Sequence, residues 1–274
     1  MLQLFSPAKI NLFLRIVNKR PDGYHNLSSL FQTVDLRDTL SFQIHHRDLL
    51  TCSDPSLPTD KSNLILQAIQ LFRDKTAISI YLKVHLEKKI PIQAGLGGGS
   101  SNAATTLWAL NQLSRLKIEE SRLMEWGAEI GSDVAFFFSN GTAYCTGRGE
   151  KIRELDPLPE QLVWIIKPGY NQSTAAVYKR LNAPLEENHQ KDLEDFLSSK
   201  ISYFNDLEKP AFEIQPELGD LKKLLIENGF QNVLLSGSGS SFFCLSPGRA
   251  IPNLNLQVYP TKFINKNSNE WFLD

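Results

Sequence analysis

The chain has 274 residues, of which 42% are hydrophobic and 22% are charged, and its formal net charge is −1. This length suits one large core or two modest ones, and the composition is typical of a globular protein. Because the net charge is close to zero and no apolar run reaches ~18 residues, we expect neither nucleic acid nor a membrane as a partner.

The three cysteines lie far apart and have no C-x-x-C spacing, which is typical of a reducing compartment. The N-terminal segment contains a lysine, an asparagine and a proline, so it does not resemble a secretory signal. We therefore expect a cytoplasmic protein. The sequence shows no coiled-coil repeat and no large apolar patch, and we expect a monomer or a weak dimer.

Positions 4–16 are mostly apolar, and Ile10, Leu12, Leu14 and Ile16 fall at every second position, as on the buried face of a half-buried strand. Lys9 and Asn11 fall opposite the apolar face, where they point either into a cleft or into solvent. The next stretch, R-P-D-G-Y-H-N-L at positions 20–27, contains a Pro-Asp-Gly turn. Its Tyr24 and His25 suit the binding of a flat heterocycle, but they equally fit two side chains that cap the edge of the core.

Three strands and a helix are predicted after this turn. The strands cover Leu30–Val34, Thr39–Ile44 and Ile78–Leu86, with Asp35–Asp38 as a turn between the first two. The helix covers residues 63–73, where apolar residues recur at helical spacing, and we expect Ser62 or Asp60 to cap it.

The most informative stretch is P-I-Q-A-G-L-G-G-G-S-S-N-A-A, at positions 91–104. Glycine lets the backbone approach a ligand closely, and a helix N-terminus offers free N–H groups and the positive end of the helix dipole. We expect a helix to begin at Asn102, so the stretch predicts a phosphate site. It lacks the lysine of a Walker loop and the last glycine of a dinucleotide fingerprint, which indicates a phosphate site of a third kind.

The helix predicted over Glu119–Ile130 ends near Gly131, and Asp133 then opens an apolar run. This carboxylate is either an N-cap or a functional group held at the edge of the core.

A hairpin at Gly141–Thr146 and Glu150–Leu155 precedes the proline-containing segment Asp156–Glu160. This segment is the expected domain boundary, and it divides the chain into residues 1–157 and 158–274. The elements predicted in the second part are a strand at Leu162–Ile166, a helix from a Ser173 or Thr174 cap to Leu181, helices at Glu186–Ser199 and Leu218–Leu225, and a strand at Leu256–Ile264.

Three stretches resemble the motifs of the GHMP family of small-molecule kinases. They are S-P-A-K-I-N-L-F-L at 6–14, the glycine stretch at 91–104, and L-L-S-G-S-G-S-S-F-F at 234–243. The last one, taken alone, is a weak phosphate signal, since a tight turn between strands explains it as well. R-P-D-G-Y-H-N-L is similar to those members whose substrate carries a cytidine diphosphate group. The resemblance implies an α+β fold of two lobes, with a deep cleft between an ATP-binding lobe and a substrate lobe, and transfer of the ATP γ-phosphate, with Mg²⁺, to a substrate hydroxyl.

The resemblance also implies Lys9 and Asp133 as the catalytic pair. The implied ATP-binding positions are Asn63, Lys88, Pro91, Gly95, Leu96, Gly97, Gly98, Gly99, Ser100 and Ser101. The implied substrate-binding positions are Asn11, Tyr24, His25, Thr174, Tyr178, Gly237, Ser238 and Gly239. Ser100 or Ser101 would be a ligand of Mg²⁺. Two positions depart from the family pattern: Gln93 stands where the family often has Gly or Ala, and Tyr178 where it usually has Phe.

Phosphoryl transfer needs positioning and charge stabilisation more than covalent chemistry. Asp133 is expected to accept or orient the hydroxyl proton, and Lys9 to keep Asp133 ionised. Tyr24 and Tyr178 are expected to stack on the two faces of the cytosine ring of the substrate. Two alternatives stay open. A GHMP kinase for another alcohol, such as homoserine or mevalonate, is disfavoured by the Tyr24-His25 pair, and a non-catalytic nucleotide-binding protein by the Lys9/Asp133 pair.

Overall fold

Two β-sheets form the framework of the protein, which the computed structural model describes over residues 1–181, 190–198, 203–249 and 255–272. The first sheet has the strand order β3-β4-β2-β5-β6, and β1 pairs with β2 outside this path. Its strands are β1 (Leu2–Lys19), β2 (His25–His45), β3 (Leu49–Cys52), β4 (Tyr81–Glu87), β5 (Thr142–Gly147) and β6 (Lys151–Glu154). The second sheet has the order β10-β7-β9-β8, formed by β7 (Leu162–Pro168), β8 (Leu234–Leu235), β9 (Phe242–Cys244) and β10 (Leu256–Lys262).

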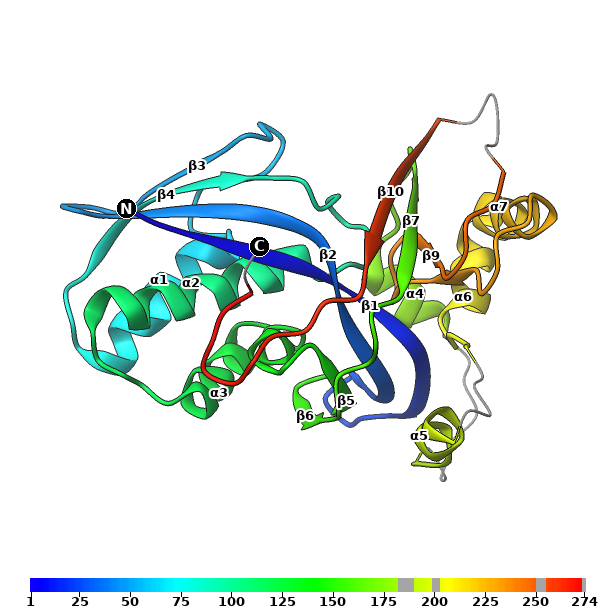
Figure 1. The fold of residues 1–274 in the computed structure, drawn as a ribbon, viewed down its shortest axis with the longest axis horizontal. Helices are drawn as coiled ribbons and strands as arrows, with labels where there is room; N and C mark the ends of the chain where they lie inside the picture. The colour runs from blue at the N-terminus through cyan, green and yellow to red at the C-terminus, as the bar shows by residue number, and fades with distance from the viewer. Residues whose placement is uncertain (182–189, 199–202, 250–254, 273–274) are drawn as a thin grey trace.

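The helices divide between the two sheets (Figure 1). The first sheet is covered on one face by α1 (Leu64–Thr76), α2 (Gly98–Ser114) and α3 (Glu120–Ile130), and a short 3-10 helix, η1, follows at Ala135–Phe138. Beside the second sheet lie α4 (Thr174–Arg180), α6 (Glu208–Ile214) and α7 (Pro216–Glu227), while α5 (Gln190–Leu197) lies apart from them. The long strands β1 and β2 run from the first group of helices toward the second sheet. The expected α+β fold is confirmed.

The strand β2 corrects the prediction of a turn at Asp35–Asp38. It runs without interruption through these residues, because β1 pairs with it on both sides of them. The register changes between Pro7 and Ala8, which pair with Arg37 and Val34, so a bulge in β2 absorbs the residues between. Turn-forming composition is overridden here because the polar groups find partners inside the protein, above all the buried carboxylate of Asp38.

The start of α2 also differs from the prediction. The helix begins at Gly98 rather than at Asn102, since Gly97 has a φ of 68° and its carbonyl accepts the first helical bond from Ser101. Two glycines and two serines therefore form the first turn. In α1 the N-cap is Asn63, whose side chain accepts from the Ile65 amide, and not the predicted Ser62 or Asp60.

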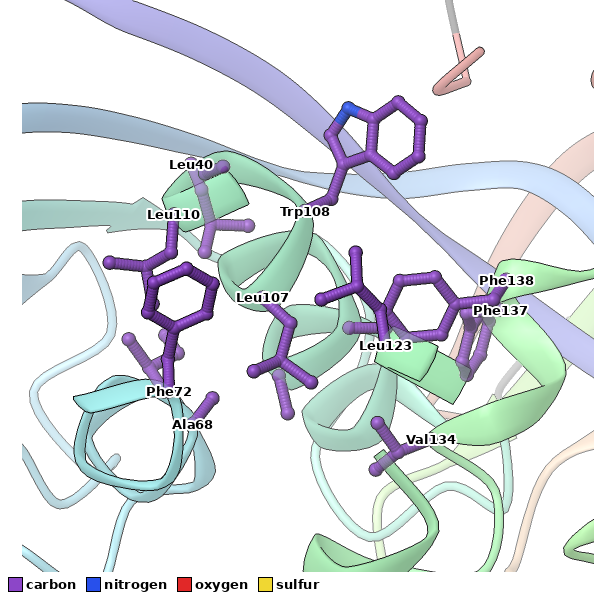
Figure 2. Packing of buried hydrophobic residues seen from close by; sticks show 14 of the residues in the cluster. Leu40, Ala68, Phe72, Leu107, Trp108, Leu110, Leu123, Val134, Phe137 and Phe138 are labelled. Carbon is purple, nitrogen blue, oxygen red and sulfur yellow. The ribbon is translucent and has the colours of Figure 1, made fainter. Parts of the chain in front are cut away.

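The main hydrophobic core lies between the first sheet and α1, α2 and α3. Figure 2 shows Leu107 and Leu110 of α2 on the side of Phe72 in α1, with Leu123 and Phe138 beyond. These side chains are fully buried or almost so, and each contributes about 1.5–3 kcal/mol to folding. The core thus fixes α2, whose first turn reaches the cavities described below.

The C-terminal segment returns to the first sheet after β10 (Figure 1). Trp271 donates a hydrogen bond of 2.7 Å to the Phe5 carbonyl, and its ring stacks on Trp108 with centroids 5.3 Å apart. The predicted division between residues 157 and 158 falls in the connection from β6 to β7, and as a division into folding units it stays a prediction. Over the described residues, no helix is long and apolar enough to cross a membrane.

Candidate active site

Two cavities meet at the glycine stretch. The larger one, of about 840 Å³, is lined by β1, by the turn before β2, by the segment after α3 and by α4. The smaller one, of about 360 Å³, lies between the segment before α1 and residues 91–99. Gly95, Gly97 and Ser100 line both cavities. A ligand that reaches from one cavity to the other must therefore pass these residues.

Lys9 lies in the wall of the larger cavity and is 4% exposed. Its Nζ lies 3.3 Å from Oδ2 of Asp133, donates 2.9 Å to Oδ1 of Asn11, and lies 4.4 Å from the centre of the Phe31 ring. Its backbone amide donates to the carbonyl of Leu96, which ties β1 to the glycine stretch. The ammonium is thus held in one position by partners on three sides.

Asn11 is 1% exposed, and its side-chain amide donates 2.9 Å to the hydroxyl of Ser29. Both Lys9 and Asn11 line the larger cavity. Of the two interpretations that the spacing allowed, the one with two solvated residues is wrong.

Asp133 follows α3 and lines the same cavity, with its side chain 30% exposed. The N-cap interpretation is wrong, because η1 starts after Val134 and has no side-chain cap. The carboxylate therefore has one oxygen next to Lys9 and enough exposure to meet a ligand.

The first turn of α2 presents backbone amides to both cavities. The N–H groups of Gly98, Gly99 and Ser100 stand at the helix start, where no intrahelical carbonyl can accept from them. Positive φ values of 79° at Gly95 and 68° at Gly97 shape the approach to this turn. Gln93 has a φ of 54°, a conformation that glycine adopts without the penalty of a Cβ. Because Gln93 has a Cβ, its backbone is strained in this conformation.

The two candidate Mg²⁺ ligands differ in their surroundings. Ser101 is fully buried, and its hydroxyl accepts a hydrogen bond of 2.8 Å from Ser6. Ser100 lines both cavities.

Lys88 and Asn63 line the smaller cavity, but their polar atoms have partners in the protein. The ammonium of Lys88 lies 3.0 Å from Asp38 and donates to the carbonyl of Ile90. Burial lowers its pKa, while the charge of Asp38 opposes this shift. The amide of Asn63 donates to Pro58, and its oxygen caps α1. Direct contacts of these two side chains with ATP stay a prediction.

Aromatic rings also line the larger cavity. His25 and Tyr178 lie with their ring centroids 5.4 Å apart, whereas Tyr24 is 58% exposed and lies beside the guanidinium of Arg148 at 5.1 Å. Burial lowers the pKa of His25, and the charge of Lys19 adds to this shift. Burial raises the pKa of Tyr178, as does the charge of Asp133. The sandwich of a base between Tyr24 and Tyr178 stays a prediction.

The second glycine-serine loop is the turn between β8 and β9. Gly237 and Ser238 line the larger cavity, and the Ser238 hydroxyl lies 2.8 Å from that of Thr174. Gly239 instead packs on the first loop, since a Cβ there would lie 2.2 Å from the backbone nitrogen of Gly95. The Ser236 hydroxyl also donates to the Gly95 carbonyl. The two loops are therefore in direct backbone contact.

Several residues of the site were not predicted from the sequence to belong to it, among them Arg148, Lys179 and Asp38. Arg148 and Lys179 line the larger cavity, and Asp38 is the partner of Lys88. A basic residue between the glycines of a hairpin turn was a signal for Arg148. Asp38 was missed because its segment was predicted to be a turn.

The family model for the GHMP kinases N terminal domain matches residues 63–141, and the model for the GHMP kinases C terminal domain matches residues 178–254. The chain belongs to the GHMP kinase family. It is 55% identical to the 4-diphosphocytidyl-2-C-methyl-D-erythritol kinase of Protochlamydia amoebophila, over 99% of this chain and 93% of the relative. It is 45% identical to the chloroplastic enzyme of the same name from Oryza sativa subsp. japonica, over 99% of this chain and 73% of the relative.

Solved structures agree with this placement. A 4-(cytidine 5'-diphospho)-2C-methyl-D-erythritol kinase has a TM-score of 0.79 and 32% identity to this chain, covering 96% of this chain and 99% of its own. A homoserine kinase from Cytophaga hutchinsonii has a TM-score of 0.75 at 20% identity, covering 97% of this chain and 96% of its own, and shows the shared fold alone.

Proposed function

We propose that this chain is an ATP-dependent kinase that phosphorylates the 2-hydroxyl of 4-diphosphocytidyl-2-C-methyl-D-erythritol, in the non-mevalonate pathway to isoprenoid precursors. The names of its relatives support this substrate, at 55% and 45% identity over 99% of the chain. The observation that carries the proposal is the set of groups that line the larger cavity together. The ion pair of Lys9 and Asp133 shares this lining with Ser100 of the first turn of α2 and with the rings of His25 and Tyr178.

The first turn of α2 would bind the phosphates of ATP. Its free amides and the positive end of the helix dipole favour an anion, and glycine leaves room for close approach. The smaller cavity on the other side of Gly95 and Gly97 would accept the rest of the nucleotide.

Asp133 would accept or orient the proton of the attacking hydroxyl. Lys9, at 3.3 Å, stabilises the negative charge of this carboxylate and would also offset charge that develops on the transferred group. Asn11 keeps the ammonium in place through its 2.9 Å hydrogen bond. Positioned charges of this kind are what phosphoryl transfer requires.

The donor groups of the cavity fit Mg²⁺, because Asp133 and Ser100 offer a carboxylate and a hydroxyl oxygen in the same lining. No cluster of three or more His, Cys, Asp or Glu side chains suited to a metal exists among the described residues. Mg²⁺ would therefore be held mainly through the phosphates of ATP, and when bound it supplies neutralisation of their charge.

The cytidine end of the substrate would lie among Tyr24, His25 and Tyr178. The rings offer flat apolar faces, and the lowered pKa of His25 leaves a neutral imidazole that donates and accepts. Arg148 supplies a cation beside Tyr24. The hydroxyls of Thr174 and Ser238 would contact the middle of the substrate.

We also propose a cytoplasmic protein that is a monomer or a weak dimer. The free thiols of Cys52, Cys145 and Cys244 support a reducing compartment.

A phosphorylation assay across candidate alcohols tests the proposal. The purified protein is mixed with ATP and Mg²⁺ and with the cytidyl-methylerythritol, homoserine or mevalonate, and ADP release is measured. We expect rapid release with the first alcohol alone. Faster release with either of the other two, or none with any of the three, would overturn the proposed function.

A further inference from the structure

Asp38 is a buried carboxylate that joins three parts of the phosphate site. It is fully buried in β2. Its Oδ1 accepts from the backbone amides of Lys89 and Ile90, at 2.7 and 2.8 Å. Both oxygens accept from the ammonium of Lys88, at 3.1 and 3.0 Å, and Oδ2 accepts from the side chain of Asn102 at 3.0 Å. One carboxylate thus holds both the segment that enters the glycine stretch and Asn102, which directly follows the first turn of α2.

The network continues from Asn102 to a serine of the glycine stretch. The same Asn102 amide donates 2.9 Å to the hydroxyl of Ser6, and Ser6 donates 2.8 Å to the hydroxyl of Ser101. These groups are all buried, so their orientations are fixed by the protein and not by water.

The segment held by Asp38 packs directly on the first residue of α2. A Cβ on Gly98 would lie 3.1 Å from the side chain of Ile90 and 3.4 Å from Nζ of Lys88. Gly98 carries one of the free amides at the helix start. A shift of residues 88–90 would therefore move a phosphate donor or close the smaller cavity, which Lys88 and Asn102 line.

We propose that Asp38 is a positioning residue of the ATP-phosphate site, which acts through Lys88, Ile90 and Asn102 and does not contact the nucleotide. This inference rests on the proposed function, because it takes the first turn of α2 as the ATP-phosphate site. Asp38 places the helix start against the glycine stretch and holds the positive charge of Lys88 at the cavity wall. It thereby sets affinity for ATP and leaves the substrate end of the larger cavity unchanged.

The variant Asp38→Asn tests the proposal. The asparagine side chain keeps one acceptor oxygen, but its NH₂ group would face the N–H donors that bond to Asp38. The ammonium of Lys88 also loses the negative charge beside it. We expect the KM for ATP, and the Kd of a non-hydrolysable ATP analogue measured by calorimetry, to rise about tenfold. The KM for the cytidyl substrate is expected to stay within about twofold.

Asp48→Asn is the matched control. Asp48 accepts from Arg73 at 2.7 Å and from the backbone amide of Leu82 at 3.0 Å, so it too joins an ion pair to a strand, but it lies outside both cavities. This variant is expected to lower the unfolding midpoint and leave both KM values unchanged. If Asp38→Asn also lowers the unfolding midpoint and leaves the KM for ATP unchanged, the role of Asp38 is merely structural and the proposal is overturned.

Ser6→Ala keeps the test decisive if Asp38→Asn does not fold. It removes one link between Asn102 and Ser101, and Ser6 itself lines neither cavity. We expect the Kd of the analogue to rise about threefold, and an unchanged Kd contradicts the proposal. Analogue binding needs no acceptor alcohol, so a wild-type protein that binds the analogue but phosphorylates none of the three alcohols would overturn the proposed function and leave this inference standing.

Discussion

Two groups of residues line the larger cavity, the phosphate end and the base end, and they are built in opposite ways. The phosphate end, formed by Lys9, Asp133 and Ser100 with the glycine stretch, is held by Lys9 and Asn11, which are buried and have hydrogen-bond partners. The base end, formed by Tyr24, His25, Tyr178 and Arg148, rests on ring contacts, and Tyr24 is 58% exposed. Phosphoryl transfer at the phosphate end needs charged groups in fixed positions, whereas recognition at the base end needs flat aromatic faces on which a ligand ring can stack. Changes at the phosphate end should therefore alter turnover or stability, and changes at the base end should alter substrate affinity.

The strongest test of this comparison is Asp133→Asn. The variant keeps the shape of the side chain but removes the charge that faces Lys9, so we expect kcat to fall roughly 10²-fold or more with the Kd of ATP nearly unchanged. Steady-state kinetics and calorimetry measure the two quantities. Asp35→Asn is the control, since Asp35 is 33% exposed and pairs with Arg37 outside both cavities. A kcat of Asp133→Asn near that of this control would remove Asp133 from its proposed role.

The contact between the two glycine loops gives the next largest effect. In Gly239→Ala the new methyl group would lie 2.2 Å from the nitrogen of Gly95, so the loops must separate. We expect the free energy of unfolding to fall by about 1–3 kcal/mol and the affinity for ATP to fall with it. Urea denaturation measures the first quantity and calorimetry the second.

Gly219→Ala is the control for this variant. Gly219 lies in α7, where alanine is the better helix former, and the nearest atom to a Cβ at this position is 3.5 Å away in Phe212 of α6. We expect a small gain in stability and no change in ATP affinity. Equal stability of Gly239→Ala and wild type would show that the loops are not in contact in solution.

At the base end we expect a dependence on pH that is absent from the phosphate end. Burial and then Lys19 lower the pKa of His25, so folding disfavours its protonation. The unfolded chain binds the proton below about pH 6.5, and stability is therefore complete above this value and falls as the pH drops toward the lower pKa of the folded state. In the folded enzyme the imidazole becomes charged, and loses its acceptor, only as the pH falls toward this lower pKa, so we expect the KM of the cytidyl substrate to rise there while the KM for ATP stays level.

His25→Gln provides the comparison for this pH profile, because glutamine offers a donor and an acceptor and does not titrate. Its KM for the cytidyl substrate should be independent of pH between about 5.5 and 7.5. The same rise in KM for wild type and variant would assign the titration to another group.

Local patterns in the sequence predicted much of this molecule. The alternation of residues 78–86 led to β4, and the apolar spacing of residues 63–73 led to α1. The glycine stretch before α2 and the Pro-Asp-Gly turn before Tyr24 also stand beside the cavities as expected. In each case the signal lies in neighbouring residues, where backbone preference and periodicity act.

Partners distant in sequence were not predictable in this way. Asp38 was expected in a turn, because its partners Lys88 and Asn102 are 50 and 64 residues away. Gly239 was expected in the substrate site, but its close neighbour is the backbone of Gly95, which lies 144 residues earlier in the glycine stretch before α2. Such contacts decide whether a polar residue is solvated or buried, and no local pattern reports them.

The smallest expected effect concerns strain in the approach to α2. At the base end the left-handed position of the turn is occupied by a glycine, Gly23, with a φ of 85°, whereas at the phosphate end Gln93 adopts a φ of 54° with a Cβ present. This conformation destabilises the folded state by about 1–2 kcal/mol for a residue with a Cβ. Glycine removes that strain, but its greater freedom in the unfolded chain offsets about 0.5–1 kcal/mol of the gain. Gln93→Gly should therefore stabilise the protein by about 0.5 kcal/mol in urea denaturation. Gln93→Ala keeps the Cβ and should give no gain, so an equal gain from alanine would place the cost in the glutamine side chain and not in the backbone.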